Sequence, residues 1–292
     1  MKEEVNHQLQ EWADSRSKPG LWLWMFFCLF GFAGLLKSQC LQTAEVFHDG
    51  EKIEYDLYFK WGLLMTKGGT ATIAVSSSEY KNTPVWKSDL LLYSTRMVDK
   101  FFRVRDTIFN YIDRRDRRLL YSVKHSDEGG YYQIDNLTYS YKGEETHVHT
   151  FRRNRNRIMT DTVLVGGNCV LDLLSSLVYT RTFNRHEMEQ GRRYDLQVAM
   201  GNVLIPLSYH YEGQRIVEKD NVKYSTRYFV VDIFDEAFTQ SKEALEVWIG
   251  DDENHIPVKL RAKLKIGAME AYYNNSSGLR YPFKSRIVVP RD

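Results

Sequence analysis

The stretch GEKIEYDLYFKWGLLMTKGGTATIAV, residues 50–75, decides the fold class of this chain of 292 residues. In its first half apolar and charged residues alternate, and a strand sends successive side chains to opposite faces. The alternation therefore predicts a long strand with one buried, aromatic face. The residues of that face are Ile53, Tyr55, Leu57, Phe59 and Trp61. Gly62, Gly68 and Gly69 interrupt the pattern before β-prone residues resume it, which predicts two antiparallel strands joined near the glycines.

Strand-like runs recur along the rest of the chain at a spacing of roughly ten residues, with turn signals between them. This spacing is typical of an antiparallel meander, so we predict an all-β protein built on one large meander sheet. A turn region is expected at 76–84, where serines and Pro84 gather. The expected strands after the opening hairpin are 85–95, 119–126, 130–142, 145–152, 194–199, 203–211, 223–232, 244–249, 256–266 and 269–273.

One stretch, residues 168–185, has the spacing of a helix. Its apolar residues recur at every third or fourth position from Val170 to Val178, and Asn168 is a suitable cap for its start. We therefore predict one short amphipathic helix. Because such a helix needs a surface on which to bury its apolar stripe, we expect it on the open face of the sheet or across its mouth.

The N-terminal part of the chain contains an apolar run, GLWLWMFFCLFGFAGLL, at residues 20–36. Its length fits both a signal peptide and a short membrane-spanning helix. We predict a polar extension over 1–19, a signal peptide or signal-anchor over 20–39, and a single β domain over 44–289. The protein is then exported, and it contacts a membrane through this segment if the segment is not cleaved.

Charge and cysteine content narrow the partners and the compartment. The 40 Lys and Arg against 38 Asp and Glu give a formal charge of +2, which predicts no nucleic acid partner. Cys28 lies in the apolar run, so Cys40 and Cys169 remain for the exported part. These two could pair in an oxidising compartment. Alternatively, Cys40 carries a lipid anchor, since it follows the apolar run.

Several runs, taken in order, carry a resemblance to a known family. They are Gly50–Phe59, Lys67–Ala71, Asp99–Asp106, Asp172–Tyr179 with Arg181, Val247–Ile249, Asp251–Asp252, Ile256–Val258 and Ile266–Gly267. Together they resemble the bacterial exported proteins of the domain of unknown function 3108 family. The resemblance covers nearly the whole exported part. It implies a large antiparallel sheet curled into a barrel or half-barrel, in the periplasm or associated with a membrane of the envelope, and it implies no activity.

Charged residues that alternate with Phe102 and Val104 mark the clearest candidate site. Inside a curled sheet such charges must be paired, and paired interior charges either line a ligand cavity or form structural ion pairs. We combine them with the aromatic face of the first strand. The predicted ligand-binding residues are Tyr55, Phe59, Trp61, Arg103, Arg105 and Asp106.

Three other motifs have a functional and a structural interpretation. His147 and His149 share one strand face and could bind zinc, but an exposed strand pair is the better interpretation. Residues 251–254 offer carboxylates for calcium, yet they lack the spacing of a calcium loop and fit a hairpin turn. The basic run 152–157 suits lipid phosphates or anionic glycans, or else forms a solvated loop. We predict no metal and no cofactor.

The leading functional hypothesis is a noncatalytic envelope protein that binds a lipid, another amphiphile or a glycan on the concave face of the sheet. A second hypothesis is a structural or assembly factor that acts by protein contact through the sheet edge or the helix 168–185. A third is an envelope hydrolase that uses Asp99 and Asp106. A lipid-embedded porin ranks last, because many strands carry charges on both faces.

Overall fold

The structure is a computed structural model that describes residue 40 and residues 45–184, 188–234, 242–264 and 267–287. The expected N-terminal extension and the signal or anchor segment lie outside these residues, and so does the side chain of Trp61. Among the described residues, no helix is both long enough and apolar enough to cross a bilayer. The described residues fall in one compact unit, Ser38–Asp292.

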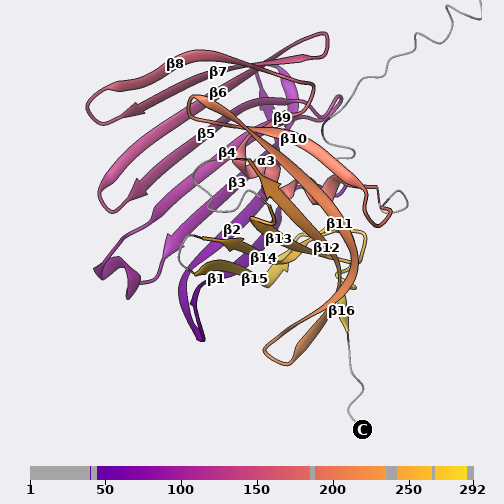
Figure 1. The fold of residues 1–292 in the computed structure, drawn as a ribbon. Coiled ribbons are helices and arrows are strands. Elements are labelled where there is room, and N and C mark those ends of the chain that lie inside the picture. Colours follow the sequence, from indigo (N-terminus) through magenta and orange to yellow (C-terminus); the bar gives the residue numbers. More distant parts are fainter. Residues whose placement is uncertain (1–39, 41–44, 185–187, 235–241, 265–266, 288–292) are drawn as a thin grey trace, which may run out of the picture. The chain divides into compact units, whose positions relative to one another are not determined.

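One sheet dominates the fold, and most strands that are consecutive in the chain pair antiparallel (Figure 1). The order across the sheet is β8-β7-β6-β5-β4-β3-β2-β1-β15-β14-β13-β12-β11-β10-β9, while β16 pairs with β12. The predicted all-β meander is therefore confirmed. The strands are β1 (Glu51–Trp61), β2 (Leu64–Tyr80), β3 (Thr83–Ser94), β4 (Arg105–Asp113), β5 (Leu119–Glu128), β6 (Tyr131–Lys142), β7 (Glu145–Asn154), β8 (Ile158–Gly166), β9 (Val170–Leu171), β10 (Arg193–Met200), β11 (Val203–Lys219), β12 (Val222–Ile233), β13 (Leu245–Gly250), β14 (Pro257–Lys263), β15 (Ala268–Ser277) and β16 (Arg286–Ile287).

The opening hairpin forms as predicted, but its glycines have different roles. The chain turns at Gly62, whereas Gly68 and Gly69 lie inside β2. A β-bulge between Leu57 and Tyr58 absorbs one of these glycines. A Cβ at Gly69 would lie 2.5 Å from the carbonyl oxygen of the neighbouring strand, so only glycine fits there.

Several strands differ from the sequence prediction. The expected turn region 76–84 is mostly strand, because β2 continues to Tyr80 and turns at Lys81 and Asn82, both with positive φ. β11 likewise runs beyond 211 to Lys219 through a bulge near Gly213. The sequence prediction missed β8, an edge strand with one exposed face and one face that is only partly buried, through residues such as Leu164. Such partial burial weakens the alternation on which strand prediction depends.

The sheet curls until its two ends nearly meet, so the barrel expected from the resemblance is confirmed. The outermost strands, β8 and β9, do not share a ladder. Two side chains close the gap instead. The Gln197 Oε1 atom accepts the backbone N–H of Gly167 at 3.0 Å, and the Thr150 hydroxyl donates to the Gly201 carbonyl at 2.5 Å.

The helix is shorter than predicted and lies in the interior of the barrel that the curled sheet forms. Val170 and Leu171 pair with β10 as a parallel strand, so α3 begins only at Leu173 and ends at Val178, followed by a 3-10 turn over Tyr179–Thr182. Its cap is Asp172, not Asn168, because the extended backbone at 172 places a carboxylate oxygen 2.8 Å from the Ser175 N–H. A second short 3-10 helix, Val98–Lys100, lies between β3 and β4.

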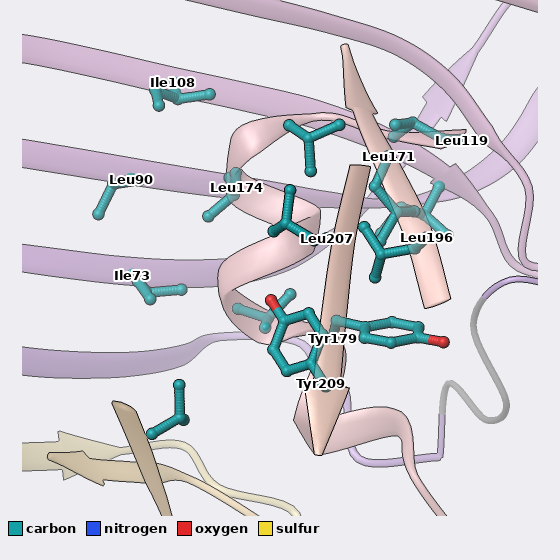
Figure 2. Close-up of a cluster of buried hydrophobic side chains, with 14 of the residues drawn as sticks. Ile73, Leu90, Ile108, Leu119, Leu171, Leu174, Tyr179, Leu196, Leu207 and Tyr209 are labelled. Carbon is teal, nitrogen blue, oxygen red and sulfur yellow. The ribbon is translucent and has the colours of Figure 1, made fainter. Parts of the chain in front are cut away.

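The core fills the space between α3 and the strands around it. Figure 2 shows Leu174 of α3 between Leu90 and Ile108 on one side and Leu207 and Tyr209 on the other. Full burial of such a side chain stabilises the fold by roughly 1.5–3 kcal/mol. The prediction that the apolar stripe lies on an open face or across the mouth is therefore wrong, since both sides of the helix are covered.

Two buried polar clusters hold this inner segment in place. The Asp172 carboxylate accepts the Ser122 hydroxyl at 2.6 Å and the Asn110 amide at 3.2 Å, and these two residues are register partners on β5 and β4. Beyond the helix, Arg181 donates to both carboxylate oxygens of Glu51 at 2.6 and 2.9 Å, with both side chains fully buried. Although burial opposes the charge, the Glu51 carboxylate holds the pKa of Arg181 above its usual value.

Cys40 and Cys169 are joined by a disulfide, with Cα atoms 4.8 Å apart. The sulfur of Cys40 is therefore engaged in this bond, which contradicts the alternative of a lipid anchor on it. The bond spans a sequence separation of 129 residues. Closing a loop of that length removes about 5 kcal/mol of chain entropy from the unfolded state.

Candidate functional site

The interior of the barrel contains an apolar cavity of about 300 Å³. Its walls come from the central strands β1–β3 on one side and β13–β15 on the other, with α3 contributing to its lining. This volume lies at the lower end of the roughly 300–1,000 Å³ of small-molecule sites. Representative lining residues are Leu57, Ile73, Leu90, Leu177, Leu260 and Ala271.

Few polar groups reach this cavity. Glu270 is the one carboxylate among the lining residues. It accepts a hydrogen bond from the Tyr272 hydroxyl at 2.6 Å, and its charge is paired with the Arg261 guanidinium, whose Nε lies at 3.4 Å. Tyr55 also lines the cavity, and its buried hydroxyl has no hydrogen-bond partner among the described residues. Desolvation by burial raises the pKa of Tyr55, so the phenol stays neutral at physiological pH. The cavity is thus suited to apolar chains rather than to sugars or ions.

A smaller pocket of about 60 Å³ lies between β4–β7 and the turn from β10 to β11. Three charged side chains, Lys124, Asp135 and Arg152, contribute to its lining. Arg152 donates to both oxygens of Asp135 at 2.6 and 2.7 Å, and these hydrogen bonds raise the pKa of Arg152. The barrel interior therefore has an apolar part and a charged part.

The helix α3 faces both spaces. Leu173 lines the charged pocket and Leu177 lines the apolar cavity, and residues four apart lie on the same face of a helix. Both side chains are half-buried, whereas Leu174 and Val178 on the remaining faces are buried against strands. The helix α3 therefore forms part of the wall of both the apolar cavity and the charged pocket.

The cavity reaches the surface at one end of the barrel. Met269 at the start of β15 lines the cavity and is 39% exposed, and Leu245 at the start of β13 lines it while only half-buried. In the register, the start of β15 lies beside Lys60, near the end of β1. The mouth therefore lies at the end of the barrel where β1 turns into β2.

Of the predicted aromatic site residues, Tyr55 lines the apolar cavity and is 3% exposed. Phe59 lies further along the same face of β1, is 37% exposed, and is not among the lining residues. The side chain of Trp61 lies outside the described residues. Of the two whose side chains are described, the structure thus brings Tyr55 to the cavity wall and leaves Phe59 outside it.

The predicted charged residues form ion pairs and do not line the apolar cavity. Arg105 donates to Asp99 at 2.6 and 3.1 Å, and these hydrogen bonds hold the pKa of Asp99 below its usual value. Arg103 pairs with Asp127 at 2.5 Å. Asp106 is buried, accepts the backbone N–H of Asp127 at 3.2 Å and lies 3.6 Å from the Lys124 ammonium. Their role in ligand binding stays a prediction.

The other motifs have structural partners. His147 and His149 lie within hydrogen-bond distance of carboxylates at 3.1 and 2.7 Å, and in the described part of the chain no group of three or more His, Cys, Asp or Glu residues could hold a metal ion. Residues 251–254 form the turn between β13 and β14, and Asp252 additionally accepts the backbone N–H groups of Lys284 and Ser285. The basic run is not simply a solvated loop, because Arg152 faces the interior pocket.

Sequence reasoning missed most of the cavity wall. Leu260 and Ala271 are register partners in β14 and β15, and Ala271 is also opposite Leu57 of β1. A small residue facing two leucines leaves open space between them. Small residues, Ala262 and Ala271, take inward-facing positions between larger apolar residues. This pattern is the feature of the sequence that could have predicted a hollow interior.

The family match and one of the two solved structures below agree with this architecture. The model of a family described as "Protein of unknown function (DUF3108)" matches residues 54–273. A crystal structure of a β-barrel-like protein of domain of unknown function DUF1849 from Brucella abortus has a TM-score of 0.54 at 8% identity, and the match covers 80% of this chain and 98% of that chain. A protein predicted to be exported, with a YmcC-like fold, from Bacteroides fragilis has a TM-score of 0.30 at 8% identity, with 80% and 99% of the two chains covered. No curated protein matches the sequence.

Proposed function

Because the chain belongs to the DUF3108 family, whose function is unknown, we propose a function from the site alone: an exported, noncatalytic bacterial envelope protein that holds the acyl chain of an amphiphile inside its barrel. The apolar cavity carries this proposal. A space of about 300 Å³ walled mostly by leucine, isoleucine and alanine side chains favours a hydrocarbon chain, because the Tyr55 hydroxyl and the Glu270 carboxylate are too few polar groups to satisfy the hydroxyls of a sugar.

Two independent features support export. The apolar run at residues 20–36 has the length and hydrophobicity of a signal peptide or signal-anchor. The disulfide between Cys40 and Cys169 fits an oxidising compartment such as the bacterial periplasm, since disulfides are rare in the cytosol.

A fluorescent fatty acid, cis-parinaric acid, tests the proposal with the purified, delipidated full-length protein. We expect saturable binding of about one molecule per chain and displacement by palmitate. Ala271→Phe places a ring between Leu57 and Leu260 and fills the cavity. It should weaken binding by at least about tenfold, which corresponds to ~1.4 kcal/mol.

The matched control is Ala74→Phe on β2. Its neighbour Ile73 lines the cavity, and adjacent strand residues point to opposite faces, so the new ring lies outside the barrel. This control also accounts for any probe bound by the apolar run at 20–36, which both variants retain. Equal affinity of Ala271→Phe and Ala74→Phe would show that the cavity is not the site, and no saturable binding to the unmodified protein would refute the proposal.

A further inference from the structure

Exposed apolar side chains gather at one end of the barrel. In a meander, alternate turns lie at the same end, so the turns after β1, β3, β5, β7, β10 and β14 share the end at which the cavity opens. Leu63 is fully exposed and Phe101 is 88% exposed. We call the exposed apolar side chains at this end the apolar rim. Its principal members are Leu63, Leu64, Met97, Phe101, Phe102 and Ile158.

The rim continues around the barrel mouth. Val203 at the start of β11 and Leu264 just after the end of β14 are also exposed, although they come from the other half of the chain. Isolated exposed apolar residues are ordinary on soluble proteins, but a contiguous set from separate turns marks an interaction surface. The rim therefore needs a partner that is itself apolar.

The opposite end of the barrel provides the internal comparison. Its turns carry Lys81 and Asn82, Glu144, and Asp220 and Asn221. Among the described residues, none of the large exposed apolar side chains lies in these turns. Exposure of large apolar residues in turns is thus confined to one end, although Ile216 and Val165 are exposed on strands closer to the other end.

Charge at the rim end favours one kind of partner. Among the described residues, three carboxylates at this end are engaged within the protein, since Asp99 pairs with Arg105, Asp127 with Arg103 and Glu243 with Lys263. Several cations beside the rim make no ion pair in the part of the chain that the structure describes. These are Arg96, Lys100, Arg153 and Arg157. The described part of the rim end therefore presents unpaired cationic side chains among apolar ones.

We propose that the apolar rim docks on the surface of an anionic lipid bilayer. Apolar side chains insert at the boundary between headgroups and acyl chains, while neighbouring Lys and Arg contact anionic headgroups. The docking does not rest on the proposed cavity ligand. If both hold, Met269 at the cavity mouth faces the bilayer, and an acyl chain enters the barrel without crossing water.

A local fluorescence readout tests the orientation with the full-length protein. Leu63→Cys and Glu144→Cys, each in a Cys28→Ser background, place the polarity-sensitive dye NBD at the rim or at the opposite end. On addition of vesicles that contain phosphatidylglycerol, the emission of the dye at position 63 should shift to the blue. Quenchers in the acyl region of the bilayer should then reduce that emission. Emission from the Glu144 position should not change. A local readout is needed because the apolar run at 20–36 could bring the chain to vesicles by itself.

Further variants separate the contributions. Phe101→Ser should reduce the fraction of Leu63 label in lipid, whereas Val163→Ser, which removes an apolar side chain 53% exposed on β8 away from the rim, should not. Arg153→Gln with Arg157→Gln should raise the lipid concentration needed for half the shift by roughly 30-fold. Ala271→Phe should leave the shift unchanged, which distinguishes docking from cavity binding.

Two results would overturn the proposal. One is a Leu63 label that stays in water, or a shift at Glu144 instead, under conditions in which circular dichroism shows a folded protein. The other is a Leu63 shift that appears without vesicles and grows with protein concentration, because the rim would then be covered by a second copy of the chain.

Discussion

Replacement of Glu51 by Gln tests the buried ion pair that fixes the segment after α3. Both side chains are fully buried, and Arg181 donates two hydrogen bonds to the carboxylate at 2.6 and 2.9 Å. Gln keeps the size of the side chain but removes its charge, so the guanidinium is left with weaker acceptors such as the Asn254 carbonyl at 3.2 Å. An uncompensated buried charge costs about 3–5 kcal/mol of unfolding free energy.

Urea unfolding followed by tryptophan fluorescence measures this loss. With an m-value of roughly 2–3 kcal/mol/M for a domain of this size, the midpoint of Glu51→Gln should fall by about 1.5 M. The double variant Glu51→Leu/Arg181→Met removes both charges and keeps apolar volume. It should recover most of the unfolding free energy. The double variant loses the attraction between the two charges, but it also no longer bears the cost of removing both charges from water.

Glu54→Gln on the same strand is the matched control. Glu54 pairs with Lys52 at 2.5 Å, but the Lys52 side chain is 50% exposed, so this loss should stay below about 1 kcal/mol. If Glu51→Gln and Glu54→Gln lose the same small amount, Arg181 is solvated in solution and the reasoning from burial is refuted.

Three further predictions concern single residues. Cys169→Ser should lower the unfolding free energy by about 2–5 kcal/mol, and thiol titration of the unfolded, unreduced parent protein should detect Cys28 but neither Cys40 nor Cys169. Burial lowers the pKa of His255, so the unfolded state takes up a proton first as the pH falls below about 6.5, and stability is lost there. His255→Asn, which tolerates the φ of 48° at this position, should flatten urea-unfolding stability between about pH 7 and 5. Tyr55→Phe should leave the thermal midpoint unchanged or raise it, because the buried hydroxyl has no partner among the described residues; a clear drop would reveal one.

The strands with one buried face could be predicted from the sequence. Ile53, Tyr55 and Leu57 alternate with charged residues and form the inner face of β1 as expected, since local alternation reflects which side of a strand is buried. The same rule failed for β8, because the apolar Val163 and Val165 lie on its exposed face while the face that carries Leu164 is only partly buried.

The helix and the cavity depended on contacts that local patterns do not contain. Val170 and Leu171 continue the helical spacing, yet their pairing with Gln197 and Val198 of β10 makes them a strand. The cavity wall combines Ile73 with Leu260, residues far apart in the chain. Such a wall is specified by the strand order, in which β1 lies beside β15, and the spacing of residues within a segment carries no information about it.

The seam between β8 and β9 has a consequence for the size of what the protein can enclose. In a closed barrel the diameter is fixed by the number and stagger of the strands. Here no ladder joins the two edges, and the contacts through Gln197 and Thr150 are single hydrogen bonds that side-chain rotation can lengthen or replace. No closed ladder therefore fixes the width of the interior, and opening the barrel at this seam would break these two hydrogen bonds but no strand pair.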